Sequence, residues 1–72
     1  MIRETRIRLI LRQLESGPMT TRQIGGALFM DLTTVSHDLT ALYQENRLSR
    51  VPAPYGTKGG KFVWSIREEH AA

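Results

Sequence analysis

The chain has 72 residues, a formal net charge of +3 and no cysteine. A chain of this length supports one hydrophobic core, and therefore one domain. Without cysteine, neither a disulfide framework nor a thiolate zinc site can supplement that core, which fits a cytoplasmic protein. Arginines interrupt the first twelve residues and exclude a transmembrane helix and a secretory signal there. We therefore expect a soluble cytoplasmic domain.

The positive charge is concentrated in the C-terminal third of the chain. Residues 13–46 contain more acidic than basic side chains, whereas residues 47–67 contain no acid. The basic residues of this last segment are Arg47, Arg50, Lys58, Lys61 and Arg67. Such a segment is typical of a surface that binds a polyanion, and a merely solvated surface is the alternative.

The first predicted element is an amphipathic helix over residues 2–16. Its apolar face follows the i, i+3, i+4, i+7 spacing of a helix: Ile7, Ile10, Leu11 and Leu14. The helix should stop at Ser16-Gly17-Pro18, because glycine adopts the left-handed conformation that ends helices and proline cannot continue one.

A second helix is expected to begin at Thr20, which has the spacing of a capping box with Gln23. Its apolar positions are Ile24, Ala27 and Leu28. Gly25 and Gly26 lower its helix propensity by about 1 kcal/mol each relative to alanine. This pair indicates either the close approach of another helix or a locally frayed segment.

A third helix is predicted after a turn at residues 29–31, with Asp31 as its cap and an end near Asn46. Its inward stripe consists of Val35, Leu39 and Leu42. Small or polar side chains occupy the opposite face: Thr33, His37, Thr40 and Gln44. Asp38 and Tyr43 are expected close to the buried stripe, away from that outer face.

The final elements are two strands, over residues 48–51 and 62–66, where apolar and polar residues alternate. They should pair, with residues 52–61 as a connecting loop rich in proline and glycine. Residues 68–72 lack an apolar pattern and are expected to form a disordered tail to a domain of residues 1–67.

Together these elements predict an α+β fold, a three-helix bundle followed by a β-hairpin wing. The sequence resembles the winged helix-turn-helix family of prokaryotic and phage transcription regulators over nearly its whole length. The resemblance depends on four stretches: Ile10–Gly17, Met19–Ile24, Thr34–Leu42 with its pattern T-V-S-x-x-L-x-x-L, and Arg47–Arg50. The chain departs from the family at residues 46–48, Asn-Arg-Leu, where many members have a glycine and two apolar residues.

The resemblance implies a sequence-selective regulator that binds double-stranded DNA with its third helix in the major groove. The residues implied to contact bases are Thr33, Thr34, Ser36, His37 and Thr40. Those implied to contact phosphates are Arg22, Arg50, Lys58 and Lys61. No arginine lies on the outer face of the third helix, so the selectivity of one monomer should be modest. The N-terminal arginines, Arg3, Arg6, Arg8 and Arg12, either reach a flanking phosphate or keep the protein soluble.

A homodimer is one interpretation of Ile2 and Leu9, which lie opposite the buried stripe of the first helix. Two scattered surface hydrophobes are the other interpretation.

The sequence gives less support to other classes of function. The chain lacks a nucleophile with its base, a carboxylate pair and a metal-ligand pattern, so we expect no enzyme, cofactor, metal, membrane or small-molecule partner. Gly59-Gly60-Lys61 is not a P-loop, because Phe62 stands where serine or threonine is required. The main alternative is a winged-helix protein–protein interaction module. A second variant is binding of left-handed DNA, although that group has Asn and Tyr where this chain has Ser36 and Thr40.

Overall fold

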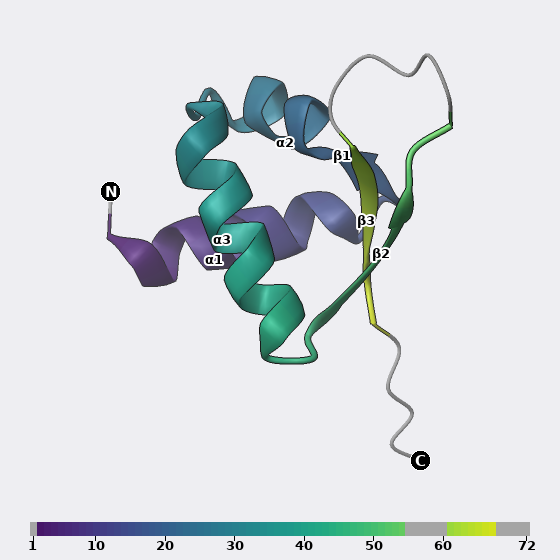
Figure 1. Cartoon of the computed structure of the whole chain (residues 1–72). Helices are drawn as coiled ribbons and strands as arrows, with labels where there is room; N and C mark the ends of the chain where they lie inside the picture. Colours follow the sequence, from purple (N-terminus) through teal and green to yellow (C-terminus); the bar gives the residue numbers. More distant parts are fainter. Residues whose placement is uncertain (1, 55–60, 68–72) are drawn as a thin grey trace.

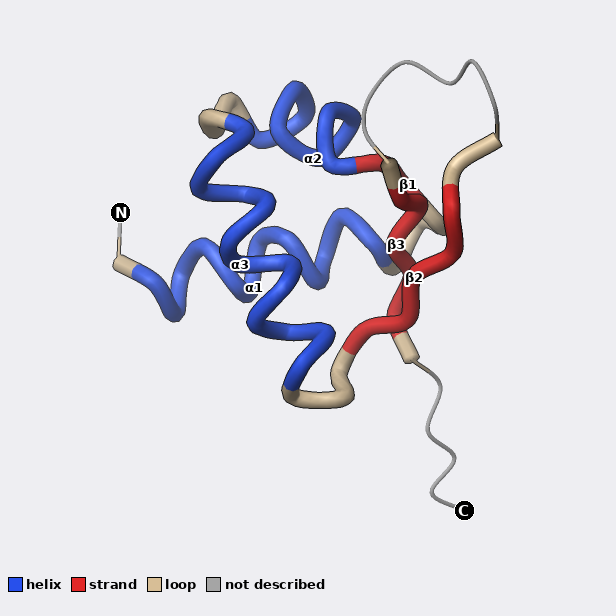
Figure 2. Tube along the Cα trace, in the orientation of Figure 1, coloured by secondary structure: helices blue, strands red, loops and turns tan. Residues whose placement is uncertain are grey.

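The computed structural model describes residues 2–54 and 61–67, which form an α+β domain with three helices and a three-stranded antiparallel sheet. In chain order the elements are α1 (Arg3–Leu14), β1 (Met19–Thr20), α2 (Thr21–Leu28), α3 (Leu32–Gln44), β2 (Leu48–Pro52) and β3 (Phe62–Ile66) (Figure 1). The sheet lies along one side of the helical part (Figure 2). The expected α+β class and its three helices are confirmed. Most of the predicted loop, with Lys58, and the predicted tail lie outside the described residues.

The sheet contains one strand, β1, that was not predicted from the sequence. β3 lies between β1 and β2, so Met19 pairs with Trp64 on one side and Arg50 pairs with Trp64 on the other. A strand of two residues is too short to show alternation, which explains why β1 gave no signal. β2 also extends one residue beyond the prediction, through Pro52. Proline is tolerated there because β2 is an edge strand.

The helix ends follow the predicted local chemistry. The hydroxyl of Thr20 accepts a hydrogen bond from the Gln23 backbone N–H at 3.2 Å, and the Gln23 side chain accepts one from the Thr20 N–H at 2.9 Å. Asp31 caps α3. Gly17 has a φ of 136° and Asn46 a φ of 64°, so the chain reverses after α1 and α3 with left-handed residues. Both helices are slightly shorter than predicted.

The hydrophobic core is shared by the helices and the sheet. Its buried members are Ile7, Ile10, Leu14, Ile24, Val35, Leu39, Leu42, Leu48 and Trp64. The predicted inward faces of α1 and α3 are therefore confirmed, with Leu11 partly buried against this core. Ala27, predicted as an apolar position of α2, is exposed.

The two glycines of α2 have different environments. Gly25 is buried, and a Cβ atom added there would lie 2.9 Å from Leu32 Cδ2 and 3.1 Å from the Met30 carbonyl oxygen. A Cβ atom at Gly26 would meet nothing within 4 Å. The close approach predicted for the pair therefore occurs at Gly25 alone, against the segment that begins α3. The alternative of a frayed helix is wrong, because α2 continues through Leu28.

The turn between α2 and α3 contains another left-handed residue, Phe29, which was not predicted from the sequence. Phe29 has a φ of 55°, and its side chain is 96% exposed. A left-handed conformation costs a non-glycine residue roughly 1–2 kcal/mol. An exposed aromatic ring therefore occupies a position where glycine is the usual residue.

Candidate functional site

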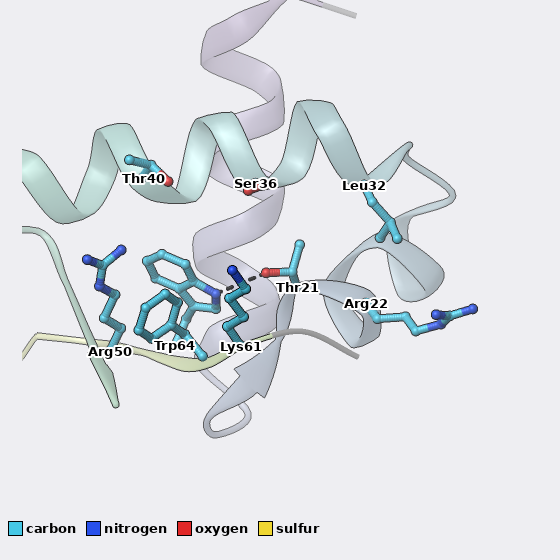
Figure 3. A pocket seen from close by; sticks show the side chains of 9 residues that line it. Thr21, Arg22, Leu32, Ser36, Thr40, Arg50, Lys61 and Trp64 are labelled. Carbon is cyan, nitrogen blue, oxygen red and sulfur yellow. Dashed lines mark hydrogen bonds between the residues drawn. The ribbon is translucent and has the colours of Figure 1, made fainter. Parts of the chain in front are cut away.

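A hollow of about 460 Å³ lies between α3, the start of α2 and the sheet, and we call it the basic groove. Its lining residues come from four elements, α2, α3, β2 and β3, and from the segment that precedes β3 (Figure 3). They are Thr21, Arg22, Leu32, Ser36, Thr40, Arg50, Lys61, Phe62 and Trp64. α2, α3 and the β2–β3 strand pair thus contribute to one surface.

Three cations give the basic groove its charge. Arg50, Lys61 and Arg22 follow one another along one side of it, and Thr40, Ser36 and Leu32 lie along the other side (Figure 3). Within residues 2–54 and 61–67, none of the three cations forms an ion pair, and the groove lining includes no carboxylate. The charge of these cations is therefore available to an anion.

The carboxylates of α3 and of the residues next to its ends interact with groups outside the basic groove. Asp38 is 1% exposed and pairs with Arg6, whose Nε lies 2.8 Å from Oδ2. This hydrogen bond raises the pKa of Arg6 above its ordinary value. Arg6 thus pairs with Asp38 inside the domain. This corrects the prediction that grouped Arg6 with the N-terminal arginines that reach a flanking phosphate. Glu45 lies 3.6 Å from a guanidinium nitrogen of Arg3.

Asp31 is held by its role as the cap of α3. Its carboxylate accepts hydrogen bonds from the Thr34 backbone N–H at 2.9 Å and from the Thr34 hydroxyl at 2.8 Å. The backbone hydrogen bond, followed by the hydroxyl one, lowers the pKa of Asp31 below its ordinary value. The Thr34 hydroxyl donates its proton to this cap. Thr34 therefore differs from the other predicted base-contacting residues, whose side chains line the outer face of α3.

Those other residues share a second hollow on the outer face of α3. This hollow, of about 500 Å³, is open and is lined by Leu32, Thr33, Ser36, His37 and Thr40. Thr33, Ser36 and His37 are exposed, whereas Thr40 is half-buried. Leu32, Ser36 and Thr40 also line the basic groove, so the outer face of α3 and the basic groove form one continuous surface.

Arg50 is surrounded by aromatic rings. Its guanidinium carbon lies 4.1 Å from the ring centroid of Tyr43, 4.2 Å from that of Phe62 and 5.5 Å from that of Trp64. Trp64 meets the other two rings edge-on, with centroids 6.3 Å from Tyr43 and 5.8 Å from Phe62. Tyr43, expected near the buried side, is instead 38% exposed, and one face of its ring covers the guanidinium of Arg50.

Four residues that line the basic groove were not predicted from the sequence as site residues: Thr21, Leu32, Phe62 and Trp64. Thr21 accepts a hydrogen bond from the Trp64 indole N–H at 3.1 Å, and Leu32 and Phe62 contribute apolar surface. Leu32 was at the first position of a predicted helix, and Phe62 and Trp64 were assigned only to a strand. No local signal distinguished them, because α2, α3 and the sheet converge only in the folded chain.

The remaining candidates lie elsewhere or outside the described residues. Arg8 and Arg12 line a surface hollow on α1 that shares no residue with the basic groove. Ile2 is 65% exposed just before α1, whereas Leu9 is half-buried, so the expected apolar strip is weaker at Leu9. Lys58 cannot be placed with Lys61, since residues 55–60 are not described.

The part of the chain that the structure describes contains neither a membrane-spanning helix nor a cluster of metal-ligating side chains. No helix there combines the length and the apolar character needed to cross a bilayer. Nor do three or more histidine or acidic side chains gather there as a set of metal ligands.

Comparison with models of known protein families and with curated protein sequences gave no match to this chain. Its function is therefore inferred from the geometry and charge of the basic groove and of the adjoining face of α3.

Proposed function

We propose that this chain is a winged helix-turn-helix domain that binds double-stranded DNA sequence-selectively, as a small transcription regulator. In this proposal α3 enters the major groove and the β2–β3 hairpin lies against the phosphate backbone. One observation carries it. The polar outer face of α3 is continuous with a groove that holds three cations and, among the described residues, no carboxylate.

The dimensions of the domain support this orientation. The element order and the β1-β3-β2 sheet are compatible with a winged helix. α3 has 13 residues, a length of about 20 Å at 1.5 Å per residue. The major groove is about 12 Å wide and accepts a helix of this kind. Gly25 lets the first turn of α3 lie close to α2, and Thr33, Ser36 and His37 in the N-terminal half of α3 are exposed.

Arg22, Lys61 and Arg50 are the proposed phosphate contacts among the described residues. They come from α2, the segment before β3, and β2, so they meet a backbone on the sheet side of α3. Each phosphate that a cation neutralises releases counterions, which makes the affinity fall as salt rises. The binding should therefore be strongly salt-dependent.

Thr33, Ser36, His37 and Thr40 are the proposed base contacts. Hydroxyl groups donate or accept hydrogen bonds, and threonine methyl groups contact the thymine methyl. Arginine paired with guanine is the commonest specific contact, and α3 has no arginine on its exposed face. The proposed selectivity per monomer is therefore modest.

A protein-interaction module is the second candidate, and one observation favours it. Phe29 is 96% exposed at the turn between α2 and α3, and exposed Leu32 follows it. Aromatic anchors of this kind are enriched in protein interfaces. The cations of the basic groove favour DNA instead, because the core of a protein interface is usually depleted of charge.

The test is fluorescence anisotropy with random-sequence duplex DNA across a salt series, followed by selection of an enriched motif. We expect Arg22→Ala/Lys61→Ala to reduce the slope of log affinity against log salt by about 1.8, at 0.9 for each phosphate contact. Thr33→Ala/His37→Ala should blur the selected motif with a smaller change in slope. Arg8→Ala/Arg12→Ala removes the same charge from α1 and serves as the matched control.

Absence of binding at low salt, in a protein shown to be folded by circular dichroism, would overturn the proposal. Equal losses in the groove variant and in the α1 control would do so as well, because they indicate non-specific attraction to a basic protein.

A further inference from the structure

Among the described residues, Arg50 is a cation held in place by aromatic rings and without an anionic partner. Its guanidinium carbon lies over two rings at 4.1 and 4.2 Å, and those rings come from α3 and β3. Tyr43 and Phe62 are in turn fixed by their edge-on packing against Trp64, which is buried in the core. The position of this guanidinium is therefore tied to the core of the domain.

The stacking leaves the hydrogen-bonding capacity of Arg50 unused. A guanidinium stacks through its faces, whereas its five N–H donors point outward in its own plane. Within residues 2–54 and 61–67 its side chain forms no hydrogen bond or ion pair. Because Arg50 lines the basic groove, these donors are accessible to a ligand that enters the groove. The expected ligand is an anion with two acceptor oxygens.

The rings do not form a binding site for a base or for a ligand cation. Arg50 already lies over Tyr43 and Phe62, so a stacked base would first have to displace it. The groove also contains Lys61 and Arg22 along the same side, an arrangement suited to a chain of evenly spaced anions (Figure 3). A phosphodiester strand has this property.

We infer that Arg50 is a preorganised clamp for one phosphodiester group of bound DNA, and that Tyr43 and Phe62 are the residues that position it. The inference rests on the proposed function. A flexible arginine loses rotamer freedom when it binds a phosphate, whereas a stacked one has lost it already. The rings therefore increase affinity without contacting DNA themselves.

Variants of Tyr43 and Arg50 separate positioning from charge. Arg50→Ala should reduce the salt slope by about 0.9 and the affinity at least tenfold, because one phosphate contact is lost. Tyr43→Leu should lower the affinity about threefold to tenfold with the slope unchanged, because the charge remains while its stacking partner is gone. Tyr43→Phe retains the ring and should bind as the wild type does.

A double-mutant cycle then tests whether the ring acts through the arginine. In the Arg50→Ala background, Tyr43→Leu should cause no further loss. Arg47→Ala is the control for charge, since Arg47 is exposed and lines a different hollow. In the DNA-free protein, the NMR signal of the Arg50 Nε–H should show an upfield ring-current shift that Tyr43→Leu reduces.

The outcomes distinguish this inference from the proposed function. If the folded wild-type chain binds no duplex DNA, both are overturned, and an acidic protein becomes the ligand to test. If DNA binds but Tyr43→Leu has its full effect in the Arg50→Ala background, or none in the wild type, the positioning role alone is overturned. Should Phe62→Leu fail to fold, Tyr43→Leu still decides the question, because its ring is partly exposed.

Discussion

The carboxylate of Asp38 on α3 accepts two hydrogen bonds from the guanidinium of Arg6 on α1, at 2.8 Å from Nε and 3.3 Å from Nη2. The pair joins two helices through residues that are 32 positions apart in the sequence. It also neutralises the carboxylate on the proposed recognition helix. In the proposed function, Asp38 therefore does not place an unpaired negative charge beside the phosphates of DNA.

We expect Arg6→Met to destabilise the fold more than Asp38→Asn does. Removing Arg6 leaves a buried carboxylate without its ionic partner, whereas the Arg6 side chain is 24% exposed and reaches water when Asp38 is neutral. The expected decrease in Tm for Arg6→Met is on the order of 10 °C. Thermal unfolding followed by circular dichroism measures it, with Arg8→Met as the control on the same helix. The reverse order of the two variants would contradict this account.

The two glycines of α2 provide a matched pair. Gly25→Ala should lower the free energy of unfolding by about 1 kcal/mol, because its Cβ atom overlaps Leu32 and crowds the Met30 carbonyl. Gly26→Ala should raise it by up to about 1 kcal/mol, because alanine has the higher helix propensity and the site is open. Urea denaturation measures both. Equal changes in the free energy of unfolding at the two positions would show that helix propensity alone determines the effect of alanine.

Phe29 adopts a left-handed backbone conformation that is unfavourable for a residue with a side chain. Phe29→Gly should raise the free energy of unfolding by about 0.5–1 kcal/mol, since glycine relieves the left-handed strain and the exposed ring contributes little packing. Phe29→Ala keeps a Cβ atom and serves as the control, with stability close to that of the wild type. Destabilisation by both variants would indicate that the ring packs against the fold.

The hydrogen bond between Trp64 and Thr21 joins the sheet to the start of α2. Thr21→Val removes the acceptor of a buried indole N–H, so we expect a loss of about 1–2 kcal/mol in the free energy of unfolding. Thr21→Ser keeps the hydroxyl and should retain most of the stability. Chemical denaturation, with Trp64 fluorescence as the signal, compares the two. A stable Thr21→Val protein would mean that the indole finds another acceptor.

The cap of α3 predicts a pH dependence. Hydrogen bonds from Thr34 lower the pKa of Asp31 in the folded state, so the ionised carboxylate stabilises the fold. This contribution is complete above the unfolded pKa of about 3.9 and is lost as the pH falls through the lower folded value. Asp31→Asn retains a capping oxygen without the charge, so its Tm should lie below that of the wild type at pH 7. The difference should vanish towards pH 2, and a difference that persists there would exclude the charge as its cause.

The sequence alone determined the local features of this protein. The capping box at Thr20, the cap at Asp31, the stop at Gly17 and the apolar stripes of α1 and α3 follow from residue chemistry within one or two turns. The placement of Asp38 beside the buried stripe was also predictable, because it follows from helical periodicity.

The tertiary structure alone decided which distant residues meet. The pairing of β1 with β3, the ion pair between Arg6 and Asp38, and the aromatic surroundings of Arg50 all join segments far apart in the chain. Such contacts arise when several elements pack around a shared core. The spacing of residues along a single helix or strand does not predict which residues of other elements they will contact. For the same reason Leu32 and Tyr43 became part of the candidate site only when α2, α3 and the sheet were brought together.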